Sequence, residues 1–462
     1  MSRGVRIALA GAAFTILAPL VGLVLMVVAD NVPDRMVMEH LFDATVDGSL
    51  DAGDYGSGLA GRRVDHFTEC IAITVGVGDP AGVNSLESAI VTPTLGKCSE
   101  AVPKIVAWAQ GDGLTRGYDY YRYWHGHAIV LRPLIAVIGV AGTRMLALFA
   151  LLGAVGALAL RFARRFGRLS AALLVGPVIA STDFVDLPRT LPHALSIGVM
   201  LVTAIVLLER APSTHPMALG AGAVAGAGFV YVDILLNPPA AWALCVAAVG
   251  FALAGRSSTI ETAGRMAMVG SGWIIGYAWM WMSKWLLAAW VLGADTVRSS
   301  ITEQIDQRVD GDQAGVDHAL FAGVRANLRE WWALPLAPVT LIAVLLAVAW
   351  AVRTRRLAGG DGLASVDRLL LSVPALIPIV WFELLRNHSQ VHALFTYRSI
   401  AVALGIAAAA WTARIDVVDP SAPVEVEHPQ HEAGDHQFAA DSDGGHRRDD
   451  DAHRVGRVEF AE

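Results

Sequence analysis

The chain has 462 residues, of which 55 % are hydrophobic and only 17 % are charged, and its mean hydropathy is +0.50. A soluble domain carries about a quarter charged residues, so this composition argues against a soluble globular protein. Residues 414–462 hold 13 acidic and 5 basic residues, which leaves residues 1–413 with a net charge of only +1. This balance provides no basic surface for nucleic acid, and three cysteines are too few for a disulfide-rich scaffold.

Apolar runs of about 20 residues recur along the chain, and a helix of that length spans about 30 Å of hydrocarbon. The first run, residues 7–29, is longer than the usual apolar core of a signal peptide, so we expect an uncleaved membrane anchor. Nine further spans are predicted at residues 135–160, 169–182, 191–208, 216–234, 239–254, 266–292, 333–352, 367–385 and 396–413. The predicted fold class is therefore an all-α polytopic membrane protein with about ten transmembrane helices.

The distribution of arginine predicts the orientation, because loops on the cytoplasmic side are enriched in basic residues. With a cytoplasmic N-terminus, the inner loops hold Arg161, Arg164, Arg165, Arg168, Arg210, Arg256, Arg265, Arg353, Arg355, Arg356 and Arg368. The short outer loops hold only Arg189, Arg386 and Arg398. Both termini are then cytoplasmic, and two long segments, residues 30–130 and 294–332, lie on the extracytoplasmic side. Residues 128–140 are expected to form an amphipathic helix at the membrane surface.

Two domains follow from this pattern. Residues 1–413 form the polytopic domain, and residues 414–462 form an acidic, His-rich cytoplasmic tail that is predicted to be disordered because it has almost no aliphatic residues. Cys70 and Cys98 both fall in the first outer segment, where an oxidising compartment permits a disulfide; two unrelated buried thiols are the alternative. The predicted location is the plasma (inner) membrane, as a multi-pass protein.

Polar side chains gather on the outer side of this topology. Outside the tail, eight of the nine histidines lie there: His40, His66, His125, His127, His193, His318, His388 and His392. Acidic residues near the outer helix ends follow the same distribution: Asp65, Glu69, Asp183, Asp186, Asp233 and Glu383. A transporter usually places its polar groups near the midplane of the bilayer, so this pattern indicates a binding or reaction site at the outer face.

Asp65 and Glu69 are the candidate catalytic acids. They are four residues apart and would share one face of a helix. A carboxylate partly buried near the membrane suits general-base chemistry, because burial raises its pKa towards neutrality; a solvated acidic helix face is the alternative. Tyr121, Trp124 and His125 precede a membrane entry and are candidates for binding a sugar ring, with an interfacial aromatic belt as the alternative.

Four basic side chains are candidates for binding a phosphate: His388, His392, Arg398 and Lys284. His388 and His392 would share a helical face, with Arg398 two turns further along if the helix is continuous, and donors spaced in this way suit a phosphate. Lys284 lies deep in its span among tryptophans, where pairing with an intramembrane carboxylate is the alternative.

The outer helix ends supply further candidates for binding the sugar or the acceptor. These are Asp186, Arg189 and Asp233. For the first two, the alternative is a structural ion pair with each other.

Several of these residues belong to four motifs that occur in a fixed order. The motifs are Asp65-His66-Phe67-Thr68-Glu69; Tyr121-Arg122-Tyr123-Trp124-His125-Gly126; Tyr231-Val232-Asp233 with Pro238; and Asn387-His388-Ser389 with His392 and Phe395-Thr396-Tyr397-Arg398. Together they resemble a family of uncharacterised bacterial, notably actinobacterial, integral membrane proteins that is grouped with the GT-C class of glycosyltransferases. As the resemblance implies, such enzymes take a sugar from a polyprenyl-phosphate donor on the outer face, and an acid in the first outer loop acts as base. Asp65 matches that role best, with Glu69 as the substitute.

We therefore predict a GT-C-like membrane glycosyltransferase that acts in cell-wall biogenesis. It would move a sugar from a polyprenyl-phosphate donor to an envelope glycan or glycolipid acceptor, with its active site facing outside. Two alternatives stay open: a transporter or lipid flippase, and a non-catalytic envelope-assembly protein. The sequence identifies no cofactor or metal ligand, although a divalent cation is compatible with the predicted site.

Overall fold

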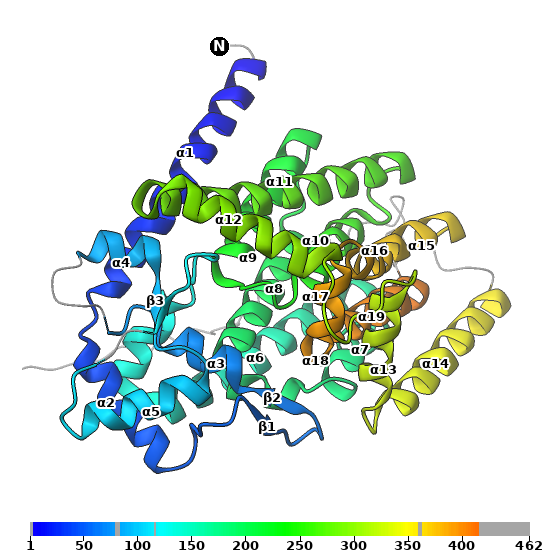
Figure 1. Cartoon of the computed structure of the whole chain (residues 1–462). Helices are drawn as coiled ribbons and strands as arrows, with labels where there is room; N and C mark the ends of the chain where they lie inside the picture. The colour runs from blue at the N-terminus through cyan, green and yellow to red at the C-terminus, as the bar shows by residue number, and fades with distance from the viewer. Residues whose placement is uncertain (1–2, 79–83, 115–116, 359–362, 415–462) are drawn as a thin grey trace, which may run out of the picture. The chain divides into compact units, whose positions relative to one another are not determined.

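The computed structural model describes residues 3–78, 84–114, 117–358 and 363–414, and the regular secondary structure of these residues is almost entirely helical (Figure 1). The predicted tail, residues 414–462, lies outside the described residues except for Arg414. Two short antiparallel strand pairs make up the described β-structure. They pair β1 (Tyr55–Ser57) with β2 (Arg63–Asp65), and β3 (Pro93–Thr94) with β4 (Tyr118–Asp119).

The helices of the first half are α1 (Arg3–Asp30), α2 (Asp34–Val46), α3 (His66–Ile73), α4 (Ser85–Val91), α5 (Cys98–Ala109), α6 (Ala128–Phe166), α7 (Arg168–Ala180), η1 (Phe184–Arg189), α8 (Leu191–Glu209) and α9 (His215–Val232). Those of the second half are α10 (Pro238–Leu253), α11 (Thr259–Leu292), α12 (Ala294–Ile305), η2 (Asp306–Asp310), α13 (Ala322–Trp332), α14 (Ala337–Ala358), α15 (Ser365–Ser372), η3 (Val373–Leu376), α16 (Ile377–Leu384), α17 (Arg386–Val391), α18 (Ala393–Thr396) and α19 (Arg398–Thr412).

Seven of the described helical stretches are long and apolar enough to cross a membrane. They confirm the predicted all-α polytopic class. Helices also occupy the other three predicted spans: α7 and α10 are apolar but shorter, and α11 is 34 residues long with several tryptophans that lower its hydropathy. Outward faces of α1 and α14 carry exposed apolar side chains such as Ile16, Val21 and Leu346, as expected for helices that face lipid.

The second long helix, α6, has a break that separates two helical segments. Gly139 has φ 69° and ψ 178°, which is outside helical geometry, so α6 consists of one helix before it and another after it. A positive φ is readily adopted only by glycine. The break lies close to residue 140, the predicted end of the surface helix, and the remaining residues up to Phe166 are long enough to span.

Close helix packing at the centre depends on glycine. On α9, Gly222 and Gly226 lie directly against the backbone of α11, and on α11, Gly272 and Gly276 lie against the backbone of α9. A side-chain Cβ at any of these positions would collide with a backbone atom of the other helix. Four-residue spacing of small residues is the usual way in which membrane helices approach so closely.

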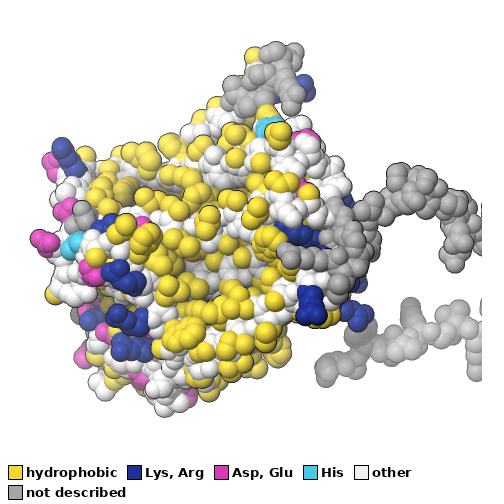
Figure 2. Space-filling model, turned by 90° about the vertical axis from the view of Figure 1, so that its right-hand side faces the viewer, with side chains coloured by type: hydrophobic (Ala, Val, Ile, Leu, Met, Phe, Trp, Pro, Cys, Tyr) yellow, Lys and Arg dark blue, Asp and Glu magenta, His cyan; other side chains and the backbone are white. Residues whose placement is uncertain are grey.

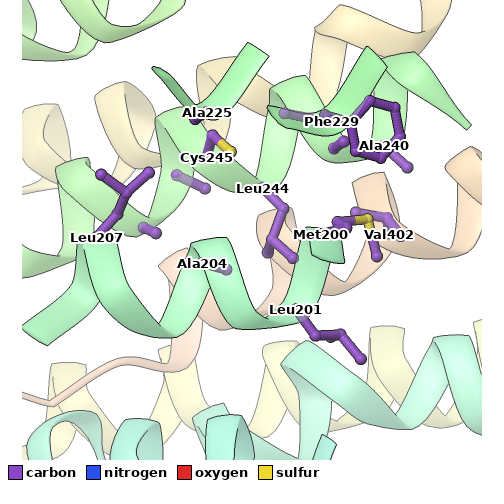
Figure 3. Packing of buried hydrophobic residues seen from close by; sticks show 14 of the residues in the cluster. Met200, Leu201, Ala204, Leu207, Ala225, Phe229, Ala240, Leu244, Cys245 and Val402 are labelled. Carbon is purple, nitrogen blue, oxygen red and sulfur yellow. The ribbon is translucent and has the colours of Figure 1, made fainter. Parts of the chain in front are cut away.

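Helix α10 is the centre of the apolar core. Fifteen of its 16 residues are buried, which is expected of a helix that is apolar on all sides. Figure 3 shows its packing against α8, α9 and α19. The labelled contacts come from Met200, Leu201, Ala204, Leu207, Ala225, Phe229, Ala240, Leu244, Cys245 and Val402.

The first outer segment has its own small core. Val37 and Leu41 of α2 pack with Ile105 of α5 and with residues of the first part of α6. A disulfide joins Cys70 of α3 to Cys98 of α5, with their Cα atoms 5.0 Å apart. This confirms the predicted pairing and fixes α3, the helix that follows Asp65, to the rest of the segment.

Loops between the helices meet in two separate groups. One group consists of the predicted inner loops. There, Arg165 donates hydrogen bonds to the carbonyl of Leu208, in the last turn of α8, and to that of Ala252, and Arg265 donates to the carbonyl of Pro212. The predicted outer segments contact one another through pairs described below. In Figure 2, hydrophobic side chains cover much of one face and charged side chains gather at its left edge.

Cysteine labelling tests which group of loops faces outwards. A cysteine replacing the exposed Asp312, in the second outer segment, should react with a membrane-impermeant thiol reagent in intact cells. A cysteine replacing the exposed Arg256, in the α10–α11 loop, should react only after permeabilisation. The reverse pattern would invert the topology and place the candidate site on the cytoplasmic side.

Candidate functional site

Four buried polar residues form a continuous charged network. Asp65 Oδ2 lies 3.1 Å from His193 Nε2, and the other ring nitrogen of His193 contacts the guanidinium of Arg398. Arg398 also binds Asp183 in a bidentate manner, with its Nε 2.6 Å from Oδ1 and its Nη2 2.5 Å from Oδ2. The side chains are at most 7 % exposed, so the network is largely shielded from solvent.

The network fixes the protonation of His193. An arginine can only donate hydrogen bonds, so the Nδ1 atom of His193 must accept from Arg398. The single ring proton then lies on Nε2 and is donated to Asp65. His193 is therefore neutral and Asp65 is ionised.

Each member of the network comes from a different part of the chain. Asp65 is the N-cap of α3, where its Oδ1 also accepts from the backbone N–H of Thr68 at 3.0 Å. Burial alone would raise the pKa of Asp65, but hydrogen bonds from His193 and Thr68 outweigh it and lower that pKa below its ordinary value. Asp183 precedes η1, His193 lies in the first turn of α8 and Arg398 begins α19.

The capping role of Asp65 corrects one expectation. Because Asp65 stands before the first turn of α3, it does not share a helix face with Glu69 in the predicted way. Both carboxylates nevertheless reach the start of α8. Glu69 Oε2 accepts from the N–H of Leu191 at 2.5 Å, and such free N–H groups at a helix start favour a nearby carboxylate.

Glu69 differs from Asp65 in its access to solvent. It is completely buried, and its Oε1 lies 3.4 Å from Arg144 Nη2. Burial raises the pKa of Glu69 to about 7, although the positive charge of Arg144 opposes this rise. That pKa suits a general base, but the Glu69 side chain has no solvent-exposed surface.

Aromatic side chains form a second group beside this network. Tyr120 lies 5.7 Å from Tyr123 and 5.2 Å from His125 between ring centroids, and Tyr123 stacks on Trp281 of α11. Burial raises the pKa of Tyr120 to about 12, and the charge of Asp65 adds to this rise, so the phenol lies within the electrostatic reach of the carboxylate. The aromatic group therefore adjoins the charged network.

The predicted sugar-binding residues of this motif lie at different depths. Trp124 is fully buried and donates its indole N–H to the carbonyl of Met280, while Tyr121 is half-buried. His125 has a positive φ of 58° and contacts the carbonyl of Tyr120 at 2.9 Å. Gly126 lies so close to the Tyr231 ring that a Cβ would overlap it, which gives the glycine of this motif a packing role.

Lys284 does not lie in the charged network. Its ammonium donates to the carbonyl of Ala89 at 2.8 Å and lies 5.4 Å from the centroid of the Trp124 ring. No carboxylate pairs with it among the described residues, so the structure does not contain the intramembrane ion pair that was the alternative. Lys284 instead joins the last turn of α4 to the aromatic group.

The last outer motif is not one continuous helix. It is divided into α17, α18 and α19, so Arg398 does not lie two turns below His388 on a shared face, which corrects that expectation. His388 and His392 are neighbours as predicted, with ring centroids 4.5 Å apart. His388 contacts the carbonyl of Leu235, and His392 is half-buried and stacks on Phe395.

Three further candidates are engaged in structural contacts. Asp186 accepts hydrogen bonds from the backbone N–H groups of Leu59 and Ala60, each at 2.9 Å, and lies 3.4 Å from Arg189. These bonds hold the β1–β2 loop on η1. Asp233, fully buried, accepts from Ser196 at 2.6 Å and from the N–H of Leu236 at 3.0 Å.

The structure therefore brings some predicted residues together and separates others. Asp65 and Arg398 meet through His193, whereas Lys284 lies with Trp124 near His125. His193 and Asp183 were recognisable in the sequence only as polar residues at outer helix ends, because contacts across more than 100 positions leave no local pattern. Among the described residues, no cluster of three or more His, Cys, Asp or Glu side chains could hold a metal ion.

Comparison with protein-family models, curated proteins and solved structures finds no match to this chain.

Asp183→Asn should strongly destabilise the protein, by about 3–5 kcal/mol, because it leaves the buried Arg398 without its carboxylate. Thermal unfolding in detergent measures the loss. Since the two charges are coupled, the double variant Asp183→Asn/Arg398→Gln should lose less than the sum of the single variants. Strictly additive losses would show that the pair is not a coupled unit.

The raised pKa of Glu69 predicts a pH-dependent stability. Between its ordinary value of 4.5 and about 7, the folded protein holds a proton that the unfolded chain has released. The free energy of unfolding should therefore fall as the pH rises through this interval. Glu69→Gln should flatten the dependence, whereas Glu39→Gln, at an exposed acid of α2, should not; an unchanged slope in Glu69→Gln would contradict the assignment.

Proposed function

We propose that this protein is a GT-C-like membrane glycosyltransferase that moves a sugar from a polyprenyl-phosphate donor to a cell-envelope glycan or glycolipid on the extracytoplasmic face. The observation that carries the proposal is the Asp65 carboxylate, kept ionised by a neutral His193 whose tautomer is set by Arg398. An ionised carboxylate held in one orientation can accept the proton of an attacking hydroxyl.

The surroundings of Asp65 support this chemistry. His193 uses Oδ2 and the N–H of Thr68 uses Oδ1, and each oxygen has a second lone pair that can accept a hydrogen bond from an acceptor hydroxyl. The carboxylate is 4 % exposed, whereas Glu69 is fully buried. Tyr120 lies within the electrostatic reach of this carboxylate and packs with Tyr123, and aromatic rings of this kind suit the apolar face of a sugar.

Arg398 supports the base rather than the phosphate in this proposal. Its Nε, Nη1 and Nη2 atoms are all used on Asp183 and His193. By holding His193 neutral, it leaves the Nε2 proton directed at Asp65. Arg398 is therefore a positioning residue for the carboxylate.

Transfer activity tests the proposal directly. The purified protein in lipid nanodiscs would receive a panel of synthetic polyprenyl-phosphate sugars with an envelope extract as acceptor, and released polyprenyl phosphate and labelled glycan would be measured. Asp65→Asn keeps the side-chain volume but removes the base, so transfer should fall by about 10²–10⁴-fold. Asp43→Asn, at a largely exposed acid of α2, is the matched control and should retain full transfer.

The alternatives give different results in the same preparation. Flipping of a fluorescent polyprenyl phosphate across proteoliposomes without any transfer would favour a flippase. Absence of both activities, together with full complementation of a deletion strain by Asp65→Asn, would favour an envelope-assembly protein. Full transfer by Asp65→Asn would show that Asp65 is not the base and that another acidic residue has this role.

A further inference from the structure

We propose that Arg308, together with His392, forms a phosphate-binding site near Asp65, and that the predicted second outer segment supplies its arginine. This inference rests on the proposed function and names the residues that would hold the donor phosphate. The sequence predicted the phosphate at His388, His392, Arg398 and Lys284. Of these four residues only His392 belongs to the proposed site, because the Nε2 atom of His388 is already engaged with the carbonyl of Leu235.

Arg308 has an unusual set of partners. It lies in η2, a short π-helix, and its Nη2 donates to the hydroxyl of Tyr123 at 2.7 Å while its Nη1 contacts the side chain of Gln304. Both partners are neutral. No carboxylate pairs with Arg308 among the described residues, so its charge is not compensated there by an acid.

The guanidinium keeps donors available. An arginine has five N–H groups, and the two hydrogen bonds to Gln304 and Tyr123 leave three without a partner in the described part of the chain. One of them, on Nε, is buried. Phosphate oxygens are the acceptors that best satisfy several donors of one guanidinium.

His392 extends the site towards Asp65. Burial lowers the pKa of His392, and the charge of Arg308 also lowers it, so the guanidinium lies within the electrostatic reach of this ring. The ring of Phe395 lies between His392 and His193: its centroid is 5.2 Å from that of His392 and 5.1 Å from that of His193. His193 contacts Asp65, so the proposed phosphate site and the base lie on one connected set of side chains.

The position of Arg308 is set by the last outer loop. The side-chain amide of Asn387 donates hydrogen bonds to two backbone carbonyls: that of Gly311, directly after η2, at 2.7 Å and that of Asp306, the first residue of η2, at 3.5 Å. Gln390 pairs with the backbone of Asp317 through two hydrogen bonds of 2.8 and 2.9 Å. These contacts give the polar residues of the Asn387 motif a definite role, which is to hold the second outer segment over the site.

Ligand binding tests this site separately from catalysis. The full-length protein in detergent would be titrated with a short-chain polyprenyl monophosphate, and the dissociation constant would be measured from tryptophan fluorescence. Arg308→Gln should weaken binding about 10- to 100-fold, the range for losing hydrogen bonds to a charged group. Arg298→Gln removes an exposed arginine of α12 in the same segment and should leave binding unchanged.

Additional probes identify the source of the phosphate. Inorganic phosphate, phosphatidylglycerol and a polyprenol without phosphate are titrated in parallel. Binding of the monophosphate but not of the polyprenol, with dependence on Arg308, supports the proposal, and a similar dependence for either other phosphate compound identifies it as a ligand of the same site. Wild-type affinity of Arg308→Gln for every phosphate probe, with binding lost in Lys284→Met, would overturn it. Binding through Arg308 without sugar transfer would retain this site and reject the transferase.

Discussion

The buried pairing of Arg398 with Asp183 is the constraint on which the end of the protein that carries Asp65 depends. Removing a charge from water is costly, and the cost is recovered only with close partners in good geometry. Arg398 meets this requirement with a bidentate carboxylate and a histidine. Because these partners come from η1 and α8, the pairing fixes the start of α19 against both elements, and through His193 it fixes Asp65 at the start of α3.

The outer segments are attached around this network by polar contacts of similar kind. Glu69 receives the first N–H of α8, and Asp186 receives two N–H groups from the β1–β2 loop. Asn387 holds the π-helix that carries Arg308. This end of the protein is thus one connected polar assembly beside an apolar helical core, and a change in one segment can reach Asp65 through few contacts.

Much of the fold could be predicted from the sequence, whereas the site could be predicted only in part. Long apolar runs identify helices because their length and composition are local properties. The shared segment of Cys70 and Cys98 permitted a disulfide but left two unrelated thiols as an alternative. The Asp65–His193 contact depends on how distant helices pack, which no local pattern records. Arg308 was missed for the same reason: it lies in a polar stretch with no motif, and only the folded chain brings it to Tyr123.

A cryo-electron microscopy structure in lipid nanodiscs, with a non-transferable phosphonate analogue of a polyprenyl-phosphate sugar, tests the central claim most directly. That claim is that a donor head group binds at the outer end of the helices, beside the carboxylate held by His193. The account predicts density for the phosphonate within hydrogen-bonding distance of Arg308 and for the sugar against Asp65 and Tyr120. Head-group density at Lys284, or along a passage to the opposite end of the helices, would contradict it.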